Sequence, residues 1–136
     1  MSTRSNIAIE LPNKKIKVIY VHSDGYPYGI GKILNQKYST YKLAKELFNF
    51  GDASYLDDTI ETCSFYGRDW GRDLDPARTY RDEWMFMRSL SGDIMIEYLY
   101  LFKNGIWHVS EQQSVAAPAD HWDGNRENLY YWTKYI

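Results

Sequence analysis

The segment that most constrains the fold lies near the C-terminal end of the chain. Within Ile94–Phe102, apolar and aromatic side chains recur at every second position, which is the period of a strand with one buried face. Asn104-Gly105 follows, the strongest short signal for a two-residue hairpin turn, and Ile106–Ser110 returns. The sequence therefore predicts an antiparallel hairpin whose facing pairs lie on one side of the sheet. These pairs are Phe102 with Trp107 and Tyr100 with Val109.

A second hairpin is predicted at the N-terminus. Asn6–Leu11 alternates between apolar and polar side chains, and Lys15–Val21 is rich in β-branched and aromatic residues. Pro12-Asn13 between them is a turn signal, because proline fixes one backbone angle and asparagine tolerates unusual ones.

Helices are expected between the two hairpins. Apolar residues recur at helical spacing from Ile30 to Tyr38 and again within Tyr41–Phe50, where Ser39 or Thr40 can cap the second helix. Gly51 stands where a glycine commonly ends a helix. Residues 80–90 suggest a third helix, whereas residues 52–79 and 114–124 lack periodicity and are expected to be irregular. The tail after residue 127 is expected to pack as a helix or a strand.

These elements predict one α+β domain that spans residues 1–136. Two hairpins suggest a mostly antiparallel sheet, with two or three helices packed on one of its faces. Strands and helices do not alternate along the chain as a doubly wound fold would require.

Composition limits the compartment and the chemistry. Cys63 is the single cysteine, so the chain has no disulfide framework and no thiolate metal cluster, which fits a reducing cytosol. No apolar run has the length of a signal-peptide core or a membrane span. We therefore expect a cytoplasmic protein with no membrane partner and no cofactor.

Charge is distributed unevenly along the chain. The formal net charge of −2 argues against general nucleic-acid binding. The first 48 residues contain eight basic and three acidic side chains, a net charge of +5, so the remainder carries −7. Such a division can steer an anionic partner toward one face, although a solvated lysine-rich surface is the commoner explanation.

Aromatic side chains are unusually abundant, with 13 Tyr, 5 Trp and 5 Phe. A core of this size does not need all of them. Tyr and Trp combine rigid contact area with a polar tip, which favours them at binding surfaces.

The loop HSDGYPYGIG, residues 22–31, is the first candidate ligand site. Its glycines allow close backbone approach to a ligand, and it leads into a helix start that favours anions. The spacing fits neither a Walker A loop nor a dinucleotide fingerprint, and a tight strand-to-helix turn capped by Asp24 is the alternative. The candidate ligand residues are His22, Asp24, Gly25, Tyr26, Gly29, Gly31 and Lys32.

The arginine-rich segment 67–84 is the second candidate. Arg68 and Arg72 could grip a phosphate in bidentate fashion, and Trp70, Tyr66 or Tyr80 could stack on a base. The alternative is local salt bridging with the five acidic residues of the same segment, which would hold a long loop in place.

Catalytic and metal sites have weaker support. His22 with Asp24, or His121 with Asp120 or Asp123, could form an acid–base pair. Three histidines, including His108, could hold a metal only by long-range convergence, because no HxH, HExxH or CxxC spacing is present. Cys63 could be a nucleophile, but a lone cysteine is more often a buried apolar residue.

Three segments together resemble a known family. The STRS start, the YVHSDGYPYGIG loop and the EYLYLFKNGIWHV hairpin are similar to those of a widespread family of small, uncharacterised bacteriophage proteins. The resemblance implies a phage accessory protein, of the host-takeover or anti-defence kind, expressed in the cytoplasm of an infected bacterium. It implies no catalytic residues.

Three functions are therefore open. The first is a nonenzymatic binder that sequesters a nucleotide-like signalling ligand, and the second is an inhibitor that binds a host protein. The third is an enzyme that cleaves phosphoesters or nucleotides. A chain of 16.1 kDa is also compatible with a homodimer.

Overall fold

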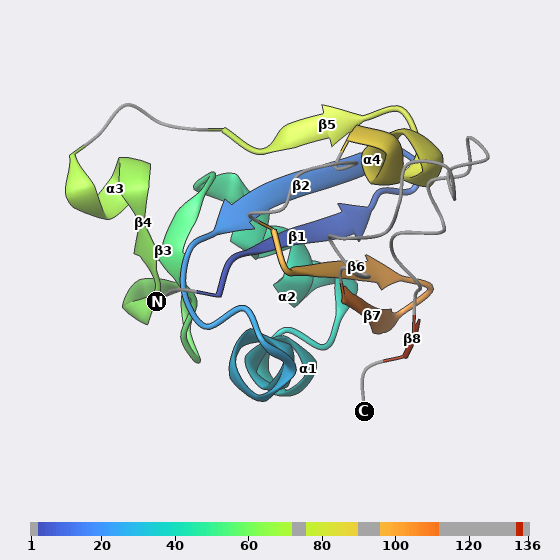
Figure 1. Cartoon of the computed structure of the whole chain (residues 1–136). Coiled ribbons are helices and arrows are strands. Elements are labelled where there is room, and N and C mark those ends of the chain that lie inside the picture. Colours follow the sequence, from blue (N-terminus) through green and yellow to red (C-terminus); the bar gives the residue numbers. More distant parts are fainter. Residues whose placement is uncertain (1–2, 72–75, 90–95, 112–132, 135–136) are drawn as a thin grey trace, which may run out of the picture.

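The computed structural model describes residues 3–71, 76–89, 96–111 and 133–134. In these residues, eight strands form one sheet in the order β4-β3-β2-β1-β6-β7-β8, with β5 paired to β2 outside this row (Figure 1). The strands are β1 (Ser5–Glu10), β2 (Ile16–Val21), β3 (Ala53–Tyr55), β4 (Ser64–Phe65), β5 (Arg78–Tyr80), β6 (Tyr98–Lys103), β7 (Ile106–Glu111) and β8 (Thr133–Lys134). The helices are α1 (Lys32–Lys37), α2 (Tyr41–Glu46), α3 (Tyr66–Trp70) and α4 (Glu83–Ser89), with short turns η1 (Pro27–Gly31), η2 (Leu47–Asn49) and η3 (Ile60–Thr62).

Both predicted hairpins are confirmed. β1 and β2 pair antiparallel from Ser5↔Val21 to Glu10↔Ile16. In the late hairpin, Phe102 faces Trp107 and Tyr100 faces Val109, as the sequence predicted. Both turn residues of this hairpin have positive φ, 56° at Asn104 and 76° at Gly105, which matches the twist of the strands that they join.

The prediction of a mostly antiparallel sheet is wrong, because the sheet is mixed. β1 and β6 run parallel at its centre, from Ser5↔Tyr98 to Ile9↔Phe102, and β2 runs parallel to β3. The long connection between the hairpins, residues 22–97, contains helices and short strands, so it can cross over and return in the same direction. Hairpin patterns fix the pairing within each hairpin but not the direction in which two hairpins meet.

The larger core lies between the sheet and the first two helices. Leu34 of α1 and Ala44 of α2 are buried there, together with β1 and β2 residues such as Ile7 and Val21. Thr40 caps α2 by accepting a hydrogen bond from the backbone N–H of Leu43 at 3.2 Å, as predicted. The apolar spacing of residues 30–48 is therefore the spacing of a helical pair that covers one face of the sheet.

Helix α4, which corresponds to the helix predicted over residues 80–90, covers the opposite face, so the expectation that all helices share one face is wrong. Phe86 of α4 is fully buried against Ala8, Val18 and Leu101, which form part of a second, smaller core. Figure 1 shows α4 on the side of β2 opposite α1. A chain with apolar residues at consecutive strand positions, such as Val18 and Ile19, needs cover on both faces.

Two buried aromatic side chains fasten the crossover to the sheet. The Tyr100 hydroxyl donates to the carbonyl oxygen of Gly25 at 2.7 Å, and Trp107 Nε1 donates to that of Tyr38 at 2.8 Å. These two acceptors lie at the start of the glycine loop and at the end of α1. The late hairpin therefore fixes both ends of the segment that connects β2 to α2.

Residues 52–79, expected to be irregular, contain five short elements: β3, η3, β4, α3 and β5. Each has five residues or fewer, so none shows a periodic signal in the sequence. Ile94, residues 114–124 and most of the tail lie outside the described residues, and Thr133–Lys134 of the tail form a strand. Among the helices that the structure describes, none is long and apolar enough to cross a membrane.

Candidate functional site

The candidate site is built on one edge of β2, where two strands share the same partner. β5 pairs with β2 at Ile16–Val18, and β3 pairs with it at Val21. The N–H of Tyr20 lies between these two ladders and donates to Asp52 Oδ1 at 2.8 Å. Asp52 Oδ2 accepts from Arg78 of β5 at 3.4 Å, so one carboxylate joins β2 to the strand beside it.

The side chain of Tyr20 meets His22 and Arg4. The Tyr20 hydroxyl oxygen lies 2.7 Å from His22 Nδ1. Burial raises the pKa of Tyr20 above its ordinary value, and the hydrogen bond and charge of the Arg4 guanidinium oppose this shift. Tyr20 therefore keeps its proton at neutral pH.

The contact between Tyr20 and His22 couples the tautomer of His22 to the direction of the hydrogen bond. With the Tyr20 hydroxyl as donor, a neutral His22 carries its proton on Nε2, whereas with His22 Nδ1 as donor the Tyr20 oxygen accepts. In both cases the two side chains are joined at the end of β2, beside Arg4.

We call these residues the Tyr20 cluster. Tyr66 belongs to it because its backbone N–H donates to the Asp52 carbonyl at 3.2 Å. The side chain of Arg78 is 43 % exposed, so its guanidinium can also reach a ligand from solvent. The cluster can bind an anion through charge and hydroxyl donors. Its members are Arg4, Tyr20, His22, Asp52, Tyr66 and Arg78.

Backbone N–H groups of the glycine loop, residues 22–31, donate to carbonyl oxygens of the protein itself. The N–H groups of Gly25, Gly29 and Ile30 donate to Thr3, Tyr26 and Asp24 carbonyl oxygens at 2.8–2.9 Å. An added Cβ would lie 2.8 Å from the Thr3 oxygen at Gly25 and 2.5 Å from the Asp24 oxygen at Gly29. Close packing therefore explains both glycines, and it favours the alternative of a tight strand-to-helix turn.

The other loop candidates lie mostly on the surface. Asp24 has a φ of 60°, and its carboxylate contacts the Tyr26 hydroxyl at 3.5 Å instead of capping the helix. Tyr26 and Lys32 are exposed, whereas Gly31 is buried at the start of α1. Of the loop candidates, His22 is the one that enters the Tyr20 cluster.

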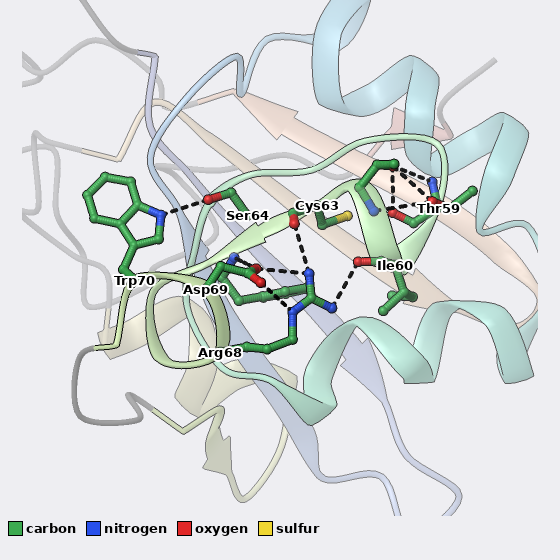
Figure 2. A network of polar contacts seen from close by, with 9 residues as sticks. Thr59, Ile60, Cys63, Ser64, Arg68, Asp69 and Trp70 are labelled. Atoms are coloured by element: carbon green, nitrogen blue, oxygen red, sulfur yellow. Dashed lines mark hydrogen bonds and ion pairs between the residues drawn. The ribbon is translucent and has the colours of Figure 1, made fainter.

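Arg68 is committed to contacts within the protein. Its guanidinium forms two hydrogen bonds with the Asp69 carboxylate at 2.8 Å and donates to the carbonyls of Ile60 and Cys63 at 3.0 and 2.9 Å (Figure 2). It also lies 4.9 Å from the Phe65 ring centre. These contacts support the alternative of local salt bridging for Arg68, since its donors hold α3 against η3.

The remaining arginine-segment candidates differ in their positions. Trp70 is 56 % exposed, and its Nε1 donates to Ser64 Oγ at 2.7 Å. Arg72 lies outside the described residues. The structure thus links Arg78 of the arginine-rich segment to Tyr20 through Asp52, and Tyr20 to His22, but it places the Arg68 guanidinium in a separate network.

Cys63 and the other histidines lie apart from the Tyr20 cluster. Burial raises the pKa of the Cys63 thiol, and its Sγ accepts the Asp57 N–H at 3.2 Å and lies 3.6 Å from the Tyr38 hydroxyl. These contacts indicate that Cys63 is a buried cysteine with a structural role. His108 lies on β7, and His121 lies outside the described residues. Within the described ranges, no group of three His, Cys, Asp or Glu side chains could hold a metal.

Sequence reasoning missed Arg4, Tyr20 and Asp52. No local pattern could identify them, because Tyr20 and Asp52 are 32 positions apart and meet only when β3 and β5 pair with β2. Comparison with known protein families, curated proteins and solved structures finds no match for this chain.

The direction of the hydrogen bond between Tyr20 and His22 is testable, and we expect Tyr20 to be the donor. We expect long-range ¹H–¹⁵N spectra of neutral His22 to show the Nε2–H form in the wild type, and a mixture with the Nδ1–H form in Tyr20→Phe, which lacks the donating hydroxyl. Tyr41→Phe, on the exposed surface of α2, is the matched control and should leave the His22 spectrum unchanged. A dominant Nδ1–H form in the wild type would contradict the proposed direction of the hydrogen bond.

The Arg68–Asp69 pair predicts a dependence of stability on pH. The hydrogen bond from Arg68 and the N–H of Phe65 hold the pKa of Asp69 below its usual value of 3.8. A carboxylate with a lowered folded-state pKa stabilises the fold above its unfolded pKa, and the contribution is lost as pH falls through the folded value. We therefore expect Asp69→Asn to lower the melting temperature at pH 7, and the difference from wild type to shrink below about pH 4.

Glu46→Gln, at an exposed position of α2, is the control for the loss of one carboxylate. An Asp69→Asn effect that stays constant from pH 7 to pH 3 would show that the ion pair does not carry the stabilisation.

Proposed function

We propose that this protein is a nonenzymatic binder that sequesters a phosphate-bearing, nucleotide-like ligand at the Tyr20 cluster. The observation that carries the proposal is the 2.7 Å contact between Tyr20 and His22, because it joins the imidazole to the cluster that also contains Arg4 and Arg78. Arg4 lies beside Tyr20, and Arg78 reaches the same edge of β2 through Asp52. Two guanidinium groups against one carboxylate leave a net positive site.

The contacts favour binding over turnover. His22 is hydrogen-bonded to Tyr20, and the Asp24 carboxylate contacts Tyr26, so the acid–base pair expected from the sequence is not joined by a hydrogen bond. A tyrosine that keeps its proton is a poor general base. A fixed set of neutral and cationic donors suits recognition of a phosphate.

A protein-binding inhibitor is the second candidate function. Exposed aromatic side chains favour it, because such residues commonly anchor protein interfaces. Tyr28 of the glycine loop is 89 % exposed, and Trp70 and Tyr55 are 56 % and 43 % exposed. In both cases we propose the setting that the family resemblance implies, a phage accessory protein of the host-takeover or anti-defence kind in the bacterial cytoplasm.

The experiment that tests the proposal is a ligand panel. Purified protein is incubated with cyclic oligonucleotides and ADP-ribose derivatives, binding is followed by native mass spectrometry and thermal shift, and the released ligand is examined by chromatography. We expect an intact bound ligand and a raised melting temperature, since a ligand that binds only the folded state stabilises it. Arg78→Ser should weaken binding at least about tenfold, which corresponds to about 1.4 kcal/mol.

Lys45→Ser is the matched control, because it removes a cation on the exposed face of α2 instead of the β2 edge. A cleaved ligand would favour the enzyme. An absence of binding across the panel would contradict sequestration, and capture of a host protein that is lost in Tyr28→Ser or Trp70→Ser would then support the inhibitor.

A further inference from the structure

Trp70 is the most exposed tryptophan among the described residues, and contacts with its neighbours hold its side chain in place. Trp70 is 56 % exposed, yet its Nε1 donates to Ser64 Oγ at 2.7 Å. The ring of Tyr66 packs edge-on against it, with ring centres 5.1 Å apart and an interplanar angle of 73°. Since the indole N–H is already satisfied, the exposed ring surface is available for stacking. Figure 2 shows the indole directed away from the Arg68 network.

The residues beneath Trp70 explain why it does not move freely. Arg68 and Asp69 fasten the same short helix to the carbonyls of Ile60 and Cys63, and the N–H of Phe65 donates to Asp69 Oδ2 at 2.8 Å. A side chain that is fixed before binding loses little conformational entropy when a ligand stacks on it. The contacts of Arg68 thus hold α3, which carries Trp70, in position, and its donors are not directed to a ligand.

Tyr66 connects Trp70 to the Tyr20 cluster. Its ring contacts the ring of Trp70, with ring centres 5.1 Å apart. Its backbone N–H is also bound to the carbonyl of Asp52, the residue that joins β2 to β5. Tyr66 therefore links the exposed indole of Trp70 to Asp52 of the Tyr20 cluster.

We propose that Trp70 is a stacking platform for a nucleobase, so that the ligand is a nucleobase-bearing phosphate. The base lies on the exposed indole, and the phosphate meets Arg4, His22 and Arg78. Stacking is tolerant of base identity, because every base offers a π-face. This inference rests on the proposed function, since it needs the Tyr20 cluster to hold the phosphate.

The test compares probes with and without a base. Adenosine 5′-monophosphate and ribose 5-phosphate are titrated separately into the full chain at millimolar concentrations. The His22 ring resonances report the phosphate, and tryptophan fluorescence reports the base. We expect both probes to shift His22, adenosine 5′-monophosphate to bind at least about tenfold more tightly, and this probe alone to quench fluorescence.

The variants separate stacking from phosphate binding. Trp70→Ala should remove the preference for the base while leaving the affinity for ribose 5-phosphate unchanged. Ser64→Ala, which removes only the hydrogen bond that fixes the indole, should reduce the preference by a smaller factor. Trp84→Ala, at the 41 % exposed tryptophan of α4, is the control and should keep the preference.

The outcomes distinguish the two proposals. If both probes shift His22 with equal affinity, or if Trp70→Ala keeps the preference for the base, the proposal that Trp70 stacks on a base is wrong. The proposal that the Tyr20 cluster binds phosphate is then retained. If neither probe shifts His22, the Tyr20 cluster does not bind phosphate, and both the proposed function and the platform are overturned.

Discussion

Two strands share one edge of β2, and the side chain of Asp52 fills the place between them. Without it, the N–H of Tyr20 would face the gap between the β3 and β5 ladders. A fully buried N–H that loses its partner costs about 1–3 kcal/mol, and the part-buried N–H of Tyr20 avoids a share of that cost by its bond to Asp52. Because Asp52 also binds Arg78, it fixes β5 beside β2 and holds one arginine at the site. The geometry of the Tyr20 cluster follows from this single side chain.

The rest of the fold holds that edge in position. On the face covered by α1 and α2, the hydroxyl of Tyr100 and the indole of Trp107 donate to carbonyl oxygens near the two ends of the segment that connects β2 to α2. On the opposite face, Phe86 of α4 packs against Val18, two residues before Tyr20. The glycine loop is consequently a fixed connection, whose N–H groups stabilise the turn. Around this scaffold, Trp70 and Arg78 are exposed, whereas His22 and Tyr66 are partly buried.

How much the sequence predicts depends on the distance over which each contact acts. The late hairpin could be predicted to the register and the N-terminal hairpin as a pair of strands, because turn signals such as Asn104-Gly105 and the period of two act between neighbouring residues. The parallel pairing of β1 with β6 could not, since about 90 positions separate their strands and no local pattern selects the direction. The short elements of residues 52–79 owe their form to partners elsewhere, as Ala53 does to Val21. For the same reason the sequence identified His22 and Trp70 but not Tyr20 and Asp52, and it offered Arg68 as a ligand residue when its donors bind Asp69 and two carbonyls.

The central claim is that Asp52 organises the edge of β2, and amide hydrogen exchange at Tyr20 tests it most directly. We expect the Tyr20 amide to exchange slowly in the wild type and quickly in Asp52→Ala. The Ile19 amide, which faces β1 by the alternation of an antiparallel pair, should stay protected in both proteins. A Tyr20 amide that exchanges quickly in the wild type, or slowly in Asp52→Ala, would contradict the claim.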